Sequence, residues 1–270
     1  MKILHIITSL GYGGAERLLL DTIHEQSDKH DFYVIYFKGT PHLIDKFPED
    51  VNITQVQVGI GIFKNIKRIF NDIEPDVVHT HLGHADLISL WALKDKKVKK
   101  FCTMHNIWYK FDWRDYLIFG FYRLINRMQV NEVHYICISD SVYKHVKHRL
   151  GVSQKNAHLL YNAIPESKLK ISQAEAKKRL GFTDNFVVLF MGRLRLQKSV
   201  ETLIRAVNLI KEDLSANNAK VLIVGEGPLE SELKKLVRDM GLQKVISFEG
   251  TTSSPEVYHK AADLFILPSV

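Results

Sequence analysis

Apolar, β-branched runs alternate with amphipathic stretches along the whole chain. The amphipathic stretches, such as AERLLLDTIHEQ and SVETLIRAVNLIKEDL, repeat their apolar residues at helical spacing. The strand-like runs cover residues 2–8, 32–38, 51–58, 76–80, 98–104, 133–138, 157–163, 186–191, 220–224, 244–249 and 263–268. Strands that alternate with helices predict parallel sheets with helices on both faces, and therefore an α/β fold.

Eleven strands are too many for one compact open sheet in a chain of 270 residues. A polar, charged segment at 162–182 separates two apolar strands, and Pro165 lies near its start. We therefore expect two doubly wound domains, residues 1–165 and 166–270, that face each other across a cleft. Ligands of such sheets bind beyond the carboxyl ends of the strands, so candidate residues should lie in the loops that follow them. The last strand ends at ILPSV with no helix after it, so we expect the second domain to be an incomplete, C-terminally truncated piece.

Composition narrows the function only slightly. No apolar run approaches the roughly 18 residues of a membrane span. Cys102 and Cys137 are the only cysteines, which favours a reducing cytoplasm over a disulfide-based fold. The formal charge of +7 attracts nucleic acid, anionic lipid or phosphorylated ligands alike. No RNP-like aromatic motif or helix-turn-helix pattern supports nucleic acid as the partner.

A glycine-rich loop, GYGGAER, follows the first strand and opens a helix. A dinucleotide fingerprint needs a third small residue, but Glu16 stands there and would crowd the helix and repel a pyrophosphate. Asp31 lies about where a ribose-binding acid is expected, which keeps an NAD-dependent oxidoreductase open. A plain tight turn is the other alternative. Gly13 and Gly14 would still let a ligand approach bare backbone.

The segment LFMGRLRLQKSVETLI carries a stronger signal for an anion. The pattern predicts a strand that ends at Met191, a turn at Gly192, and a helix that starts near Ser199. Arg193 and Lys198 would then flank a helix N-terminus and neutralise a diphosphate without metal. Plain solvated charge is the alternative for such a loop. No D-x-D motif occurs, so nothing in the sequence suggests a metal held by paired aspartates.

The segment VLIVGEGPLESEL repeats the strand–loop–helix design. Glu226 makes this loop a poor phosphate site but a candidate acceptor of ligand hydroxyl groups. Pro228 would occupy the first helical position, where proline is an ordinary helix start.

Histidines end two of the predicted strands. Strand alternation places His79 and His81 on the same face, where structural or hydrogen-bonding roles are favoured because the spacing identifies no convincing further zinc ligand. His105 and Asn106 follow the next strand. A neutral His105 would hydrogen-bond a sugar or a phosphate, and catalytic and structural roles both remain open.

Two basic, aromatic stretches have the profile of helices that lie on an anionic membrane surface. Packing against the sheet is favoured for residues 61–73. Residues 107–128 contain more aromatic side chains than one helix usually hides, which favours a surface or acceptor-binding role.

The segments GGAER, DVVHTH, TMHN, CISDS, YNAIP, GRLRLQKS, GEGP and ADLFILPS occur in this order. The series resembles that of the retaining, nucleotide-sugar-dependent glycosyltransferases of family 4, whose GT-B fold has two Rossmann-like domains. The resemblance covers the whole chain. The family's paired glutamates, E-x7-E, begin just past LPS, whereas this chain ends at Val270. Their absence would weaken donor binding and turnover by this fragment.

The resemblance implies roles for individual residues. Arg193 and Lys198 would clamp the donor diphosphate, and His105 would contact the donor sugar beside the reacting centre. The implied catalytic residues are His105, Arg193 and Lys198, the donor-binding ones Gly13, Gly14, Arg193, Lys198, Glu226, Phe248, Gly250 and Thr251, and the acceptor-side ones Glu16, His81, Asn106 and Trp108.

The implied reaction moves a sugar from a UDP-sugar, without metal, to a glycan or lipid-linked acceptor in cell-surface polysaccharide or glycolipid synthesis. It would take place in the cytoplasm, at the inner face of the membrane. The alternatives are a non-catalytic sugar-nucleotide-binding protein, an epimerase of the same fold and the NAD-dependent oxidoreductase.

Overall fold

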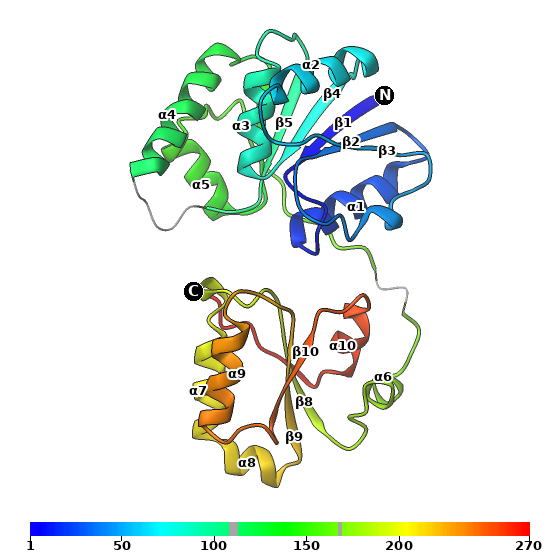
Figure 1. The fold of residues 1–270 in the computed structure, drawn as a ribbon, viewed down its shortest axis with the longest axis vertical. Helices are drawn as coiled ribbons and strands as arrows, with labels where there is room; N and C mark the ends of the chain where they lie inside the picture. The colour runs from blue at the N-terminus through cyan, green and yellow to red at the C-terminus, as the bar shows by residue number, and fades with distance from the viewer. Residues whose placement is uncertain (108–112, 167–168) are drawn as a thin grey trace. The chain divides into compact units, whose positions relative to one another are not determined.

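The computed structural model of the chain describes residues 1–107, 113–166 and 169–270. It divides into two compact units, an N-terminal unit, Met1–Pro165, and a C-terminal unit, Glu166–Val270. Each unit contains one parallel β-sheet with helices on both faces (Figure 1). All eleven predicted strands are present, so the α/β class and the two Rossmann-like sheets are confirmed.

The sheet of the N-terminal unit has seven strands in the order β3-β2-β1-β4-β5-β6-β7. Their bounds are β1 (Lys2–Ile7), β2 (Asp31–Tyr36), β3 (Asn52–Gln55), β4 (Val77–His81), β5 (Lys99–Met104), β6 (Val133–Cys137) and β7 (Ala157–Leu159). Every pair is parallel. The direction of winding reverses between β1 and β4, which is where an open α/β sheet forms its ligand crevice.

Helices cover both faces of this sheet. They are α1 (Gly14–Gln26), α2 (Ile62–Ile73), α3 (Gly83–Ala92), α4 (Trp113–Met128) and α5 (Asp140–Arg149), with a 3-10 turn at Ile44–Lys46. The alternation along β1 explains the two layers: Leu4 and Ile6 pack with α2 and α3, whereas Ile7 packs with α1 on the other face.

The two membrane-like stretches pack largely as ordinary helices. In α2, Ile62 and Ile66 are buried against the sheet, as expected for residues 61–73. In α4, Phe119 and Tyr122 are buried with β5 and β6, while Tyr116 is exposed. The helix therefore hides some of the aromatic side chains of residues 107–128 and leaves Tyr116 at the surface. Nowhere in the described part of the chain is a helix both long and apolar enough to cross a bilayer.

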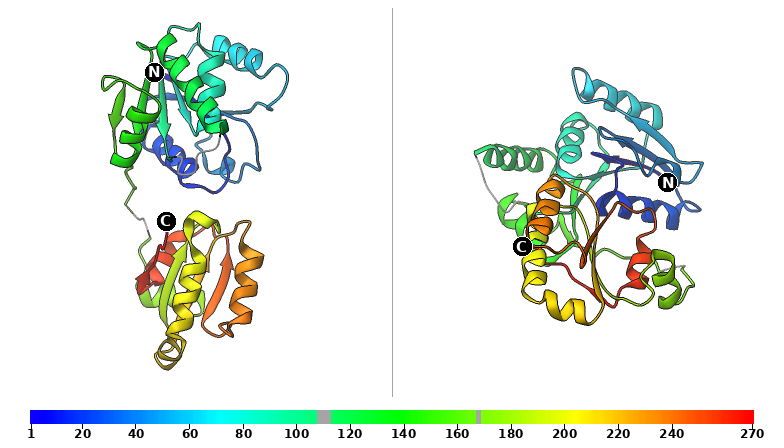
Figure 2. Two further views of the ribbon diagram at one scale, coloured as in Figure 1. Left: turned by 90° about the vertical axis from the view of Figure 1, so that its left-hand side faces the viewer. Right: turned by 60° about the horizontal axis from the view of Figure 1, so that its bottom comes forward.

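The sheet of the C-terminal unit has the order β10-β9-β8-β11, again all parallel. Its strands are β8 (Phe186–Met191), β9 (Ala219–Val224), β10 (Ile246–Gly250) and β11 (Leu264–Phe265), and its helices are α6 (Gln173–Leu180), α7 (Val200–Leu209), α8 (Lys211–Ala216), α9 (Glu230–Asp239) and α10 (Pro255–Ala261). One face packs against α7 and α9, and the other against α10 (Figure 2).

Strand ends differ from the sequence-based bounds where pairing is incomplete. The run 157–163 forms only the three residues of β7, because β6 offers them a partner on one side only. The run 263–268 likewise shortens to β11, which pairs with β8 alone. Apolar character predicts these runs correctly, but a strand extends only as far as a neighbouring strand supplies hydrogen bonds.

A buried carboxyl group ties three elements of the N-terminal unit together. Asp86, in the first turn of α3, accepts hydrogen bonds from Thr80 Oγ1 on β4 at 2.6 Å and from Tyr122 OH on α4 at 3.2 Å. Burial raises the pKa of Asp86 to about 7, although both hydrogen bonds act in the opposite direction.

Because this pKa is raised above the unfolded value of 3.8, the group's stabilising contribution is present at low pH and is lost as the pH rises towards 7. We expect Asp86 to lower the free energy of unfolding by about 2–3 kcal/mol between pH 5 and pH 7.5. Asp86→Asn should remove this decrease of the free energy of unfolding with rising pH. Urea unfolding followed by tryptophan fluorescence isolates the N-terminal unit, since Trp91, Trp108 and Trp113 all lie there. Equal pH dependence in wild type and variant would contradict the expectation.

Candidate functional site

The carboxyl ends of parallel strands share one edge of each sheet, so the loops that follow them cluster there. In the N-terminal unit these loops follow β1, β4 and β5 and carry the glycine-rich segment and the histidines. In the C-terminal unit they follow β8, β9 and β10 and carry the basic segment. Each edge therefore gathers its own set of candidate residues.

The glycine-rich loop opens α1 without a capping side chain. Gly13 is the N-cap residue, and its carbonyl accepts the amide of Arg17 at 2.9 Å. Gly14 begins the helix, and a Cβ atom added to it would meet nothing within 4 Å. The helix N-terminus therefore presents bare amide groups with open space beside Gly14, the local geometry of an anion site.

The two acidic residues of the dinucleotide hypothesis have other surroundings. Glu16 is 3% exposed, and its carboxylate accepts a hydrogen bond from Ser9 Oγ at 2.8 Å. Asp31 is the first residue of β2 and pairs with Lys2, so it lies at the amino edge of the sheet. The expected ribose-binding position of Asp31 is therefore wrong. The oxidoreductase alternative is left without the acidic residue that would bind the ribose of NAD.

The histidines form one cluster, in which His5 and His81 are buried and His79 and His105 are half-buried. His79 and His81 share a face, as strand alternation predicts, and their ring centroids lie 4.3 Å apart. His5 Nδ1 of β1 lies 3.0 Å from His81 Nε2, and His105 Nε2 lies 3.5 Å from His81 Nδ1. His79 Nε2 pairs with Thr103 Oγ1 at 2.7 Å. Four imidazoles, from β1, β4 and the loop after β5, thus lie together.

Burial keeps these rings neutral. It lowers the pKa of His79 and of His105 to about 4, with repulsion from His105 a smaller cause for His79. Burial, followed by repulsion from neighbouring histidines, holds the pKa values of His5 and His81 well below the usual range. At neutral pH the cluster therefore offers neutral donors and acceptors and no charge.

Three of these rings also approach the geometry of a metal site. One ligand nitrogen each from His5, His79 and His81 lies within 4.8 Å of the others. The hydrogen bonds already occupy nitrogens of all three rings, and a divalent cation there would be buried with no carboxylate in the group to balance it. Hydrogen bonding therefore accounts for the cluster better than a metal does.

His105 is half-buried, as His79 is, and Asn106, which follows His105 in the chain, is exposed. His81 is only 3% exposed, and its Nδ1 contacts the half-buried His105. Leu82 follows His81 with φ 73°, a backbone conformation that non-glycine residues seldom adopt and that is frequent at functional sites. Trp108 lies outside the described residues.

In the C-terminal unit, backbone hydrogen bonds join the three loops at the carboxyl edge. The amide of Leu194 donates to the carbonyl of Glu226 at 2.9 Å, and the amide of Gly225 donates to that of Gly250 at 2.6 Å. The amide of Leu229 donates to the carbonyl of Leu194 at 3.3 Å. The loops therefore form one layer rather than three independent segments.

This layer requires glycine in the GEGP segment. A Cβ atom on Gly225 would lie 2.1 Å from the carbonyl oxygen of Gly192, and one on Gly227 would lie 2.4 Å from that of Leu194. Gly225 also has φ +128°. Pro228 lies in a turn, two residues before α9 begins at Glu230, so its expected place at the first helical position is wrong.

The basic segment has the geometry that its sequence predicts. β8 ends at Met191, and α7 begins at Val200 after the N-cap residue Ser199. Arg193 is exposed, and Lys198 is half-buried at the end of a 3-10 turn, Leu196–Lys198. The Lys198 chain folds back over the loop, since a Cβ on Gly192 would lie 4.0 Å from its Cε.

The N-terminus of α7 lies directly after Lys198 in the chain. Ser199 has φ 48°, and its hydroxyl pairs with Thr202 Oγ1 at 2.8 Å rather than capping an amide. Two cationic side chains and a helix N-terminus thus belong to one short segment, which suits a phosphate group.

The segment expected to hold a nucleotide base is only partly exposed. Phe248 packs against the α7–α9 core, with Lys234 Nζ 5.6 Å from its ring centroid. Gly250, with φ +69°, ends β10 and is followed by the exposed Thr251. Glu226 is exposed in the neighbouring loop. A base would therefore meet the backbone near Thr251 more readily than the Phe248 ring.

The sequence analysis did not identify His5, Ser9 and Thr103 as residues of the candidate site. The one available signal was His5 itself, a polar residue in the otherwise apolar strand KILHII. Ser9 and Thr103 gave none, because their roles depend on contacts with Glu16 and His79.

Two known protein families match almost all of the chain. Residues 12–168 match the family described as Glycosyltransferase Family 4, and residues 171–270 match Glycosyl transferases group 1.

Two curated relatives are informative. Over 143 residues the chain is 30% identical to an uncharacterized glycosyltransferase of Methanocaldococcus jannaschii, covering 50% of this chain and 36% of that protein. It is 24% identical to the N-acetylgalactosamine-N,N'-diacetylbacillosaminyl-diphospho-undecaprenol 4-alpha-N-acetylgalactosaminyltransferase of Campylobacter jejuni, covering 98% of this chain and 73% of that one. The chain thus spans about a third of the first relative's length and about three quarters of the second's.

The fold is also that of Alr3699/HepE of Anabaena, solved in complex with UDP-glucose. The TM-score is 0.80 at 18% identity, over 100% of this chain and 74% of that one. At this identity the likeness shows the fold, which is the GT-B fold that the motifs imply.

The close approach of the β8 and β9 loops generates a stability prediction. Gly227→Ala should destabilise the C-terminal unit by about 1–3 kcal/mol, because its Cβ would overlap the backbone of Leu194. Gly192→Ala is the matched control, since its Cβ would meet side-chain atoms alone at ordinary contact distances, the Phe190 ring at 3.5 Å and Lys198 Cε at 4.0 Å. Thermal unfolding followed by circular dichroism measures both variants. Equal melting temperatures would contradict the loop geometry.

Proposed function

Because the chain belongs to glycosyltransferase family 4, we propose that it transfers a sugar from a UDP-sugar to a glycan or lipid-linked acceptor, with retention of anomeric configuration. The observation that carries this proposal is the anion site of the C-terminal unit: Arg193, Lys198 and the N-terminus of α7 in one segment. The proposed acceptor fits cell-surface polysaccharide or glycolipid synthesis at the cytoplasmic face of the membrane.

The proposed chemistry begins with heterolysis of the bond between the sugar and the diphosphate. Positive charge develops on the sugar and negative charge on the departing phosphate oxygen. Arg193 and Lys198 would stabilise that oxygen more strongly in the transition state than in the ground state, which lowers the barrier. The leaving phosphate would itself take the acceptor's proton on the same face, so no protein base and no metal are required.

The N-terminal unit would contribute neutral contacts. Gly14 leaves room for the donor, and Gly13, the N-cap residue, carries no side chain over the bare amides. His105 would hydrogen-bond an oxygen of the donor sugar, since burial holds its pKa at about 4 and the ring is neutral. Asn106 is exposed for an acceptor, whereas Glu16 would act indirectly through Ser9.

The choice of UDP as the donor nucleotide rests on the structural similarity to a protein solved with UDP-glucose. The Anabaena protein of the same fold was solved with UDP-glucose, and that complex supports a uridine donor for this chain. By the resemblance to family motifs, the proposed contacts of the nucleoside are Glu226, Phe248, Gly250 and Thr251.

Arg193→Ala should weaken UDP binding by roughly tenfold to a hundredfold, because a charge-assisted hydrogen bond to phosphate is lost. Arg195→Ala is the matched control, an exposed arginine in the same loop. Saturation-transfer NMR and calorimetric titration of this chain with UDP, GDP and NAD measure the affinities. Transfer from UDP-sugars should be lost in Arg193→Ala and kept in Arg195→Ala.

Several outcomes would overturn the assignment. Tight NAD binding without nucleoside diphosphate binding would support the oxidoreductase instead. UDP-sugar interconversion without an acceptor would identify an epimerase. Binding without any turnover would identify a sugar-nucleotide-binding protein. Unchanged UDP affinity in Arg193→Ala would remove the proposed diphosphate clamp.

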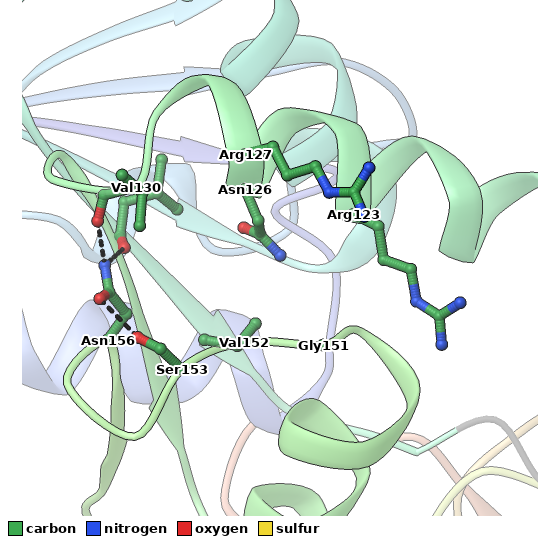
Figure 3. Close-up of a pocket in the computed structure, with 9 residues that line it drawn as sticks. Arg123, Asn126, Arg127, Val130, Gly151, Val152, Ser153 and Asn156 are labelled. Carbon is green, nitrogen blue, oxygen red and sulfur yellow. Dashed lines mark hydrogen bonds between the residues drawn. The ribbon is translucent and has the colours of Figure 1, made fainter.

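A lipid-linked acceptor also predicts contact with an anionic membrane, which we propose for α4. The name of the Campylobacter relative includes a diphospho-undecaprenol carrier. Leu117, Leu124 and Met128 are exposed on α4. Arg123 and Arg127 project from the same helix beside a surface pocket of about 390 Å³, with Ser153 at its other end (Figure 3). Exposed apolar and cationic side chains together suit an anionic leaflet.

We expect Arg123→Ala/Arg127→Ala to reduce binding to phosphatidylglycerol vesicles by roughly thirtyfold, because each of the two cations near the surface contributes about 1 kcal/mol. Arg179→Ala/Arg205→Ala is the control, which removes the same charge from the C-terminal unit. Co-sedimentation at low and high salt measures both. If both pairs lose binding equally, net charge rather than α4 is responsible. If the wild-type protein binds anionic vesicles no better than neutral ones, the membrane proposal is wrong.

A further inference from the structure

Three of the four clustered imidazoles form a continuous hydrogen-bonded row. It runs from His5, fully buried on β1, through His81 at the end of β4, to the half-buried His105 after β5. His81 uses both ring nitrogens, Nε2 toward His5 and Nδ1 toward His105. His105 is thus the only member of this row that reaches the surface.

The row couples the proton positions of its members. Each neutral imidazole has one N–H and one lone pair, and each contact needs one of each. Two arrangements satisfy both contacts. Either all three rings carry their proton on Nδ1, so that His5 donates to His81 and His81 donates to His105, or all three carry it on Nε2 and the direction reverses.

The buried end of the row distinguishes the two arrangements. His5 Nε2 is buried and has no hydrogen-bond partner among the described residues. With all protons on Nε2, this atom would be a buried N–H without an acceptor, which is rare in native structures. With all protons on Nδ1, it is only an unused lone pair. The arrangement protonated on Nδ1 therefore avoids an orphaned donor.

We propose that His81, supported by His5, is a positioning residue that keeps His105 protonated on Nδ1, so that His105 presents an N–H donor to an oxygen of the bound substrate. The ligand group selected is an oxygen acceptor, either a sugar hydroxyl or a phosphate oxygen. This inference deepens the proposed function and rests on it for the identity of the substrate. The buried row defines which atom of His105 carries the proton before any ligand binds.

His79 provides an internal comparison. Its ring lies against that of His81, tilted by 31° with centroids 4.3 Å apart, but its Nε2 pairs with Thr103 Oγ1 and it takes part in neither hydrogen bond of the row from His5 to His105. Loss of His79 should therefore disturb packing without changing the tautomer of His105.

The test is a direct reading of the tautomers in this chain without ligand, by ¹⁵N NMR of imidazole nitrogens in protein labelled at histidine. Signals are assigned with single His→Gln variants. We expect a pyrrole-type shift at Nδ1 and a pyridine-type shift at Nε2 for His105, His81 and His5. A His105 protonated on Nε2 overturns the proposal whether or not the chain is a glycosyltransferase.

Variants separate positioning from structural support. His81→Leu removes the donor, so both nitrogens of His105 should show shifts averaged between the tautomers. His81→Asn places an amide donor near the former Nδ1 and should restore the wild-type pattern. His79→Leu is the control and should leave His105 unchanged. If His81→Leu has no effect on His105, or His79→Leu has the same effect, the proposal is wrong.

Kinetics provide the functional measurement. His81→Leu should lower kcat of sugar transfer by roughly tenfold, with rescue by His81→Asn, because one hydrogen bond to the substrate is lost. Absence of transfer in all proteins, with the NMR pattern intact, would count against the proposed function but not against the tautomer assignment. Transfer unaffected by His81→Leu, with the tautomer altered, would overturn the functional part of the inference.

Discussion

The parallel hydrogen-bonded ladder is the constraint on which the rest of the structure depends. All the paired strands of both sheets run in the same direction as their neighbours, so every carboxyl end in a sheet reaches one edge. Segments that are far apart in sequence therefore lie side by side, as His5 on β1, His81 at the end of β4 and His105 after β5 do in the N-terminal unit. In the C-terminal unit the same rule brings Gly192, Gly225 and Gly250 together, and backbone hydrogen bonds join their loops.

The two edges differ in electrostatic character, and the difference follows from burial. In the N-terminal unit, desolvation keeps the clustered imidazoles neutral. In the C-terminal unit, Arg193 remains exposed and carries its charge. Membership of glycosyltransferase family 4 gives this division a chemical meaning: in the proposed reaction, fixed cations serve the departing diphosphate, while neutral hydrogen-bonding groups serve the sugar.

The sequence predicted much of the fold because its signals are local. Apolar periodicity identified all eleven strands, and the polar segment around Pro165 separated the apolar runs of the two sheets. It also identified the basic segment between β8 and α7 correctly. Errors arose where an assignment depended on a partner elsewhere. Asp31 proved to begin a strand at the amino edge, where it pairs with Lys2 of β1.

By itself, then, the sequence determined the α/β class, the order of elements and the residues placed after each strand, since these depend on side-chain type and spacing along the chain. Only the tertiary structure decided which of those residues meet. The register between β1 and β4 pairs His5 with His79 and brings it to His81, and the approach of the β8 loop excludes any side chain at Gly225 and Gly227. Such contacts depend on distances between remote segments, which no local pattern encodes.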